Sequence, residues 1–109
     1  MYIYNVTINL DPAIHQEWLI WMDTHIQEVL ATGKFTAAKF TQVLVEENIE
    51  GFTYSVQYTA ATREDLDNYY AQDAPKLQKE SVLKFSDKML AFRTELKIIK
   101  EYYPIATHN

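Results

Sequence analysis

Three segments of the chain alternate apolar and polar side chains, which is typical of strands with one buried face. They cover residues 2–10, 52–59 and 90–98. Because successive side chains of a strand point to opposite faces, each segment has one face for the core and one that can meet water or a polar partner. We expect the core face to carry Tyr2, Tyr4, Val6, Ile8, Leu10, Phe52, Tyr54, Val56, Tyr58, Leu90, Phe92, Leu96 and Ile98.

A helix is expected directly after the first strand. Asp11 can cap its start, and Pro12 suits the first helical position, where its missing N–H costs nothing. Helical spacing then gathers aromatic and aliphatic residues on one half of the helix as far as Leu30, and Gly33 follows as a left-handed C-terminal cap. This pattern predicts an amphipathic helix that lies on a sheet.

A further strand is expected within residues 34–47, where β-branched and aromatic residues gather. The polar residues 46–51 then form a turn, so this strand and the one beginning at Phe52 are expected to make an antiparallel hairpin.

The second helix is expected to begin at Thr62, whose spacing to Asp65 resembles a capping box. Proline disfavours helical geometry in the residue before it, so this helix should break near Pro75. A second helical piece should run to about Lys88, with these residues facing inward: Leu77, Val82, Leu83 and Phe85.

The resulting order, β-α-β-β-α-β, predicts a ferredoxin-like α+β domain with a four-stranded antiparallel sheet and two helices on one face. We expect this single domain to cover residues 1–100, followed by a C-terminal tail, 101–109. The other face of the sheet would be open, because nothing in the pattern covers it. The open face is expected to carry Asn5, Thr7, Asn9, Ser55, Gln57, Arg93 and Glu95.

Composition narrows the class of protein. The 109 residues have a net charge of -5 and no cysteine, which argues against nucleic-acid binding and excludes disulfides and thiolate chemistry. Only 2 glycines are present, so a glycine-rich phosphate-binding loop is not expected. No signal peptide or membrane span is evident, and a cytoplasmic location is the default expectation. We expect neither a metal nor another cofactor.

Six segments spread over roughly residues 1–100 form a recognisable set: YNVT from Tyr4, WLIWMDTHIQEVL from Trp18, TGKF from Thr32, YSVQY from Tyr54, YAQDAPKL from Tyr70 and FRTEL from Phe92. Together they resemble a small bacterial domain-of-unknown-function family, domain of unknown function 4286. That family is similar to the dimeric α/β barrels, in which two ferredoxin-like subunits bring their open sheet faces together. The resemblance implies a homodimer and no established activity. The wider superfamily includes cofactor-independent monooxygenases, haem-degrading enzymes, isomerases and ligand-sensing domains.

His25 is the first candidate for chemistry. It lies one helical turn from Trp21, at the edge of the apolar half of the helix, so it can project into a cleft and act as an acid or base. The alternative is a half-buried histidine that only hydrogen-bonds a loop. His15 is more central on the same half, and the two are too far apart to share a metal ion.

Arg93 and Glu95 are two residues apart on a strand, so they share a face. They can orient a carboxylate or enolate ligand, but they can equally pair with each other or with Lys97, or form a polar seam with a second subunit. Asn5 and Gln57 fit a ligand site or an interface.

Tyr69, Tyr70 and Asp73 precede the break at Pro75, where a loop can border a pocket, although packing of an aromatic helix explains the two tyrosines as well. From these residues we expect a small dimeric domain that binds a small ligand or a partner. The alternative is a cofactor-independent monooxygenase or isomerase with a pocket near His25, Trp21 and Arg93.

Overall fold

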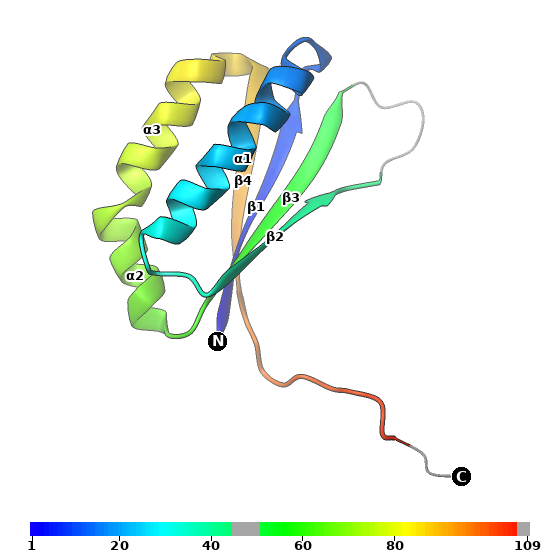
Figure 1. The fold of residues 1–109 in the computed structure, drawn as a ribbon, viewed down its shortest axis with the longest axis vertical. Coiled ribbons are helices and arrows are strands. Elements are labelled where there is room, and N and C mark those ends of the chain that lie inside the picture. The colour runs from blue at the N-terminus through cyan, green and yellow to red at the C-terminus, as the bar shows by residue number, and fades with distance from the viewer. Residues whose placement is uncertain (45–50, 107–109) are drawn as a thin grey trace.

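A computed structural model describes residues 1–44 and 51–106 of the chain. The elements follow the order β1 (Tyr2–Leu10), a 3-10 turn η1 (Pro12–Ile14), α1 (His15–Ala31), β2 (Ala37–Gln42), β3 (Phe52–Ala60), α2 (Arg63–Gln72), α3 (Ala74–Phe85), a second 3-10 turn η2 (Ser86–Lys88) and β4 (Met89–Lys97). The four strands form one antiparallel sheet in the order β2-β3-β1-β4. The helices lie on one face of this sheet (Figure 1). The predicted ferredoxin-like α+β fold is therefore confirmed.

Local signals in the sequence place most helix ends. The Asp11 carboxylate accepts a hydrogen bond from the Ala13 N–H at 2.8 Å, but the first turn is 3-10 and α1 begins only at His15. Thr62 caps α2 by accepting from the Asp65 N–H at 3.0 Å. The break at Pro75 is confirmed, because α2 ends at Gln72 and α3 begins at Ala74. The predicted polar turn at 46–51 lies mostly outside the described residues.

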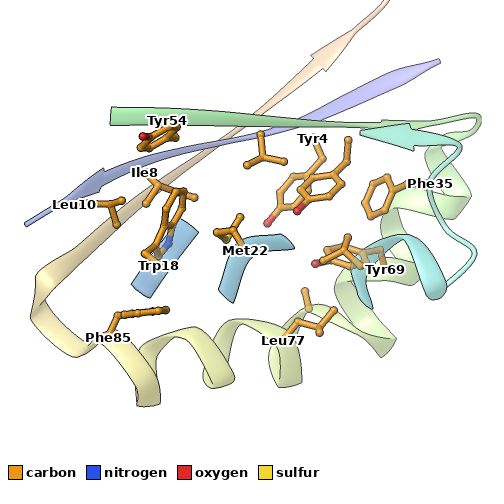
Figure 2. Close-up of a cluster of buried hydrophobic side chains, with 14 of the residues drawn as sticks. Tyr4, Ile8, Leu10, Trp18, Met22, Phe35, Tyr54, Tyr69, Leu77 and Phe85 are labelled. Carbon is orange, nitrogen blue, oxygen red and sulfur yellow. The ribbon is translucent and has the colours of Figure 1, made fainter. Parts of the chain in front are cut away.

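The core fills the space between the sheet and the helices (Figure 2). Trp18 of α1 and Leu66 of α2 are completely buried, and four of the tyrosines (Tyr4, Tyr54, Tyr58 and Tyr69) are buried with them. The rings of Tyr4 and Tyr58 lie 6.0 Å apart, and Phe35 packs against both. This aromatic core anchors the helices on the sheet, as expected for Tyr54 and Tyr58.

The faces of β4 are the reverse of the prediction. Val6 pairs with Arg93 and Tyr4 pairs with Glu95, and residues directly opposite each other share a face. Arg93 and Glu95 therefore lie on the helix side, whereas the apolar side chains of β4 lie on the open face: Leu90, Phe92 and Leu96. The alternation misled because β4 is an edge strand, where long polar side chains on the helix side still reach solvent.

Two residues of α3 also differ from the prediction. Val82 and Leu83 were expected to face inward but are exposed. The buried stripe of α3 is instead formed by residues spaced by three or four positions: Ala74, Leu77, Ser81 and Phe85. Ser81 is a small polar residue within this otherwise apolar stripe.

In the described part of the chain, none of the helices combines the length and the hydropathy that a bilayer-spanning helix needs.

Candidate functional site

A cavity lies between the sheet and the helices, beside the aromatic core. Its walls come from β1, β3 and β4 on one side and from α1, α2 and α3 on the other. The hollow measures about 470 Å³ with its open mouth, but the centre of a water-sized molecule can reach only about 40 Å³ of it. One water molecule needs roughly 10–15 Å³ of the volume that its centre can reach, so the enclosed part of the cavity has room for a ligand group of only a few atoms.

The α1 wall of the cavity carries Trp21 and His25. Their rings stack with centroids 4.4 Å apart at 17°, because residues four apart lie on the same side of a helix. Nδ1 of His25 is buried without a hydrogen-bond partner among the described residues. Nε1 of Trp18 is also buried without a hydrogen-bond partner among the described residues, but Trp18 does not line the cavity.

The imidazole of His25 is held in its neutral form. Burial lowers the pKa of His25, and the nearby Glu80 carboxylate only partly opposes this effect. A neutral imidazole has one nitrogen that can accept a proton or a hydrogen bond. The orphaned Nδ1 is therefore a polar contact that a molecule in the cavity can use.

The β4 wall carries Arg93. Its Nε donates a hydrogen bond to the Tyr4 hydroxyl at 3.0 Å, and none of the salt bridges among the described residues includes Arg93. Burial raises the pKa of Tyr4, and the Arg93 guanidinium and the Gln78 side chain act against that rise. Arg93 is exposed although it lines the cavity, so it marks the place where the cavity meets solvent.

Glu95 does not join Arg93 at the cavity. Its carboxylate accepts from Arg63 at 2.5 Å, and Arg63 also pairs with Asp67 at 2.9 Å. Tyr70 lies beside this cluster, where burial and the Glu95 carboxylate raise the pKa of its hydroxyl. Arg93 and Glu95, which were predicted to act together, therefore lie in different environments. Arg93 lines the cavity, whereas Glu95 is paired with Arg63 outside it.

The remaining candidates lie elsewhere. Asp73 forms a salt bridge with Lys34 at 3.2 Å, which joins the end of α2 to the segment after α1. Asn5 and Gln57 are paired on the open face of the sheet, where Ser55 donates to the Asn5 amide oxygen at 2.6 Å. His15 is bonded to the Tyr54 hydroxyl at 2.6 Å and stacks on Phe52, which is a structural role.

Several cavity residues had no role in the sequence-based site: Tyr4, Gln78 and Ser81. Tyr69, which was a candidate for a pocket wall, does line the cavity. A weak signal existed for Ser81, because it stands between Leu77 and Phe85 in a stripe with helical spacing. A small polar residue there leaves room that a larger apolar one would fill. Gln78 had no signal, since a single amide on a helix is usually solvated.

The chemistry available at the cavity is limited and specific. Apolar and aromatic side chains make most of the wall, one guanidinium stands at the mouth and one neutral imidazole lies within. Among residues 1–44 and 51–106, no three histidine or acidic side chains gather in a way that can hold a metal ion. This arrangement can bind a small, partly apolar molecule and can accept a proton from it.

Solved structures support the fold. A dimeric ferredoxin-like protein from an uncultured marine organism is 11% identical, with 93% of this chain and 97% of that chain covered and a TM-score of 0.73. A member of the ethyl tert-butyl ether d (ethd) family from Bacillus halodurans is 16% identical, with coverage of 91% and 100% and a TM-score of 0.65. A protein from Arabidopsis thaliana, also 16% identical, has coverage of 97% and 98% and a TM-score of 0.59. At these identities the likeness concerns the fold alone.

A search of curated proteins gave no match. The profile of one family, Domain of unknown function (DUF4286), matches residues 1–99, a range that includes every helix and strand from β1 to β4. The resemblance found in the sequence is thereby confirmed, and the chain belongs to the DUF4286 family.

Proposed function

We propose that this domain binds a compact organic acid, with its apolar part in the cavity and its carboxylate at Arg93. The observation that carries the proposal is the place of Arg93, at the mouth of a cavity whose wall is otherwise mostly apolar and aromatic. Small-molecule sites commonly combine an apolar wall with a few polar groups that fix the ligand's orientation.

Charge favours an acid over a neutral ligand. The Arg93 guanidinium uses Nε on Tyr4, which leaves its Nη groups for a carboxylate, and a guanidinium can hold both oxygens of a carboxylate at once. The size of the enclosed space, about 40 Å³ for water-sized centres, favours an apolar part of only a few atoms. Acids from acetate to butyrate match these limits.

Thermal unfolding tests the proposal, because a ligand that binds only the folded state raises the apparent Tm. We expect propionate at millimolar concentration to raise the Tm more than propionamide, which has the same shape without the charge. The Arg93→Gln variant should lose this difference. Lys97→Gln removes a positive charge from the same strand at a position that does not line the cavity, and it should keep the difference. Equal shifts with acid and amide in the wild type would overturn the proposal.

We also propose that two copies associate through the open face of the sheet. Leu90, Phe92 and Leu96 make an apolar stripe there, beside the hydrogen-bonded polar side chains of β1 and β3. Such a face is too apolar for bare solvent and too polar for a second core. A protein with a similar fold is described as dimeric, which supports the association of two copies.

A second candidate function is proton transfer, as in a cofactor-independent monooxygenase or an isomerase. The neutral imidazole of His25 in the same cavity as Arg93 favours it. In such a step His25 takes a proton from a carbon beside a carbonyl, and the electron pair moves to the carbonyl oxygen, where Arg93 stabilises the charge.

Deuterium exchange tests this candidate. The C3 protons of 2-oxobutyrate in D2O should exchange faster with the wild type than with His25→Gln. Exchange at the rate of the buffer alone would remove the enzymatic candidate and leave the binding proposal untouched.

A further inference from the structure

The residues after β4 form an extended segment that leaves the domain, and we call residues 98–106 the C-terminal arm. Figure 1 shows this arm running away from both the sheet and the helices. Its backbone is tied to the domain by the Ile98 N–H, which donates to the Met1 carbonyl at 2.9 Å. Beyond Ile98, the polar and cation–π contacts that the arm's side chains make with residues of the described ranges stay within the arm: Tyr103 donates to Glu101 at 2.6 Å, and Lys100 lies 5.1 Å from the Tyr102 ring centroid.

The arm is unusually apolar for a segment that leaves a folded domain. Ile99, Tyr102, Tyr103 and Ile105 are all large, and between 77% and 92% of their surface is exposed. Segments that stay in solvent commonly consist of small and polar residues, because the exposure of apolar surface to water is unfavourable. The composition therefore indicates that a second surface covers the arm.

The arm also continues the apolar stripe of the open face. Leu90, Phe92 and Leu96 extend this stripe almost to the end of β4, and the apolar residues of the arm begin directly after the strand with Ile98 and Ile99. If two open faces meet, the stripe of each copy extends past the end of its own sheet. The surface available beyond that end belongs to the other copy.

The strand β2 offers a matching edge. It is one of the two edge strands of the sheet and pairs only with β3 among the described residues, so the backbone groups on its outer side lack a strand partner. It has 6 residues, and exposed apolar side chains belong to it or follow it: Phe40, Val43 and Leu44. Eight extended residues, 99–106, span at most about 26–29 Å, which is longer than a six-residue strand at roughly 20 Å. Pro104 lacks an N–H and suits only the end or the outer side of such a pairing.

We infer that the C-terminal arm of each copy docks along the outer edge of β2 in a second copy, so that two arms are exchanged within one dimer. The added strand forms backbone hydrogen bonds with the outer edge of β2. The apolar side chains of the arm then cover the exposed side chains of Phe40 and Leu44. This inference rests on the proposed dimer.

Sedimentation of the full chain gives the first test. The double variant Tyr103→Asp with Ile105→Asp should dissociate at a concentration at least tenfold higher than the wild type. The matched control is Ile20→Asp with Leu83→Asp, which places the same charges on exposed apolar residues of the helices. It should associate like the wild type. An arm variant that dimerises as tightly as the wild type would overturn the inference and leave the dimer standing, whereas a monomeric wild type would remove both.

Paramagnetic labelling locates the arm. The chain has no cysteine, so Ala106→Cys carries a single spin label beside the arm's apolar residues. This labelled copy is mixed with unlabelled wild type enriched in ¹⁵N, so that line broadening in the ¹⁵N spectrum reports only contacts between copies. We expect broadening at the amides of β2. A dimer without broadening at β2 would overturn the docking site.

Discussion

His25 and Arg93 contribute to the cavity in opposite ways because their polar atoms meet different surroundings. Nδ1 of His25 is buried without a partner, so it gains from any donor or acceptor that enters the cavity. Arg93 is exposed and already donates a hydrogen bond to the Tyr4 hydroxyl, so its guanidinium is oriented before a ligand arrives. His25 therefore supplies an unused hydrogen-bonding atom inside the cavity, and Arg93 supplies an oriented guanidinium at its mouth.

The variant His25→Gln should weaken the acid sensitivity of the fold. Burial lowers the pKa of His25 from its usual 6.5, so below that pH the unfolded chain takes up a proton that the native imidazole refuses. The stability contributed by the neutral imidazole is complete above pH 6.5 and is lost as the pH falls towards the native pKa, by at most about 1.4 kcal/mol per pH unit. Urea unfolding at pH 7.5 and 5.5 measures this loss, which should be smaller in the variant. An equal loss in both proteins would show that His25 does not titrate in this way.

Two leucines on consecutive helices should respond very differently to truncation. Leu66 is fully buried whereas Leu83 is 74% exposed, so Leu66→Ala should cost about 2–5 kcal/mol of unfolding free energy. Leu83→Ala should change it by less than about 0.5 kcal/mol. Chemical denaturation of both variants makes the comparison. A large loss for Leu83→Ala would restore the inward orientation that the apolar pattern of the helix first indicated.

At the scale of elements, the sequence predicted what local physics decides. The order of strands and helices, the Thr62 cap, the left-handed Gly33 and the break near Pro75 all depend on a few neighbouring residues. The faces of β4 were predicted wrongly, because alternation alone does not say which of the two faces lies towards the helices. Which face is buried depends on the register with β1, which is a tertiary property.

The candidate site was predictable in part for the same reason. Trp21 and His25 share a helix, and their spacing of four residues was enough to place them side by side. Arg93 was a candidate, but its place at the cavity depends on the pairing of β1 with β4. Tyr69 and Gln78 reach the cavity only through the packing of α2 and α3, which no local pattern specifies.

The two glycines should differ in what a side chain costs. Both have positive φ, 77° at Gly33 and 94° at Gly51, but only at Gly51 would an added Cβ meet backbone, 2.5 Å from the Leu10 carbonyl oxygen. Gly33→Ala should lower the unfolding free energy by about 1–2 kcal/mol, the cost of left-handed backbone for an alanine. Gly51→Ala should lower it further, because β1 and β3 must shift. Thermal or urea unfolding would contradict this if the two variants were equally stable.

At the scale of the whole molecule, the sheet is covered by helices on one face and bears an apolar stripe on the other. Phe92 stands in the middle of that stripe with 52% of its surface exposed. In the proposed dimer the variant Phe92→Asp buries a charge at the interface, so it should raise the dissociation constant of the dimer at least tenfold, or about 1.4 kcal/mol. Sedimentation equilibrium measures this constant, and Ile20→Asp on the helix side should leave it unchanged. A Phe92→Asp variant that dimerises normally would place the interface elsewhere.

The central claim is that the cavity beside Arg93 and His25 holds a small organic acid. Nuclear Overhauser contacts between propionate and the protein test it most directly, because they identify the protons that touch the ligand. We predict contacts from the propionate methyl group to cavity side chains, with Trp21, Met22 and Val29 foremost, and their loss in Arg93→Gln. Contacts confined to surface residues outside the cavity, or contacts that survive unchanged in Arg93→Gln, would contradict the account.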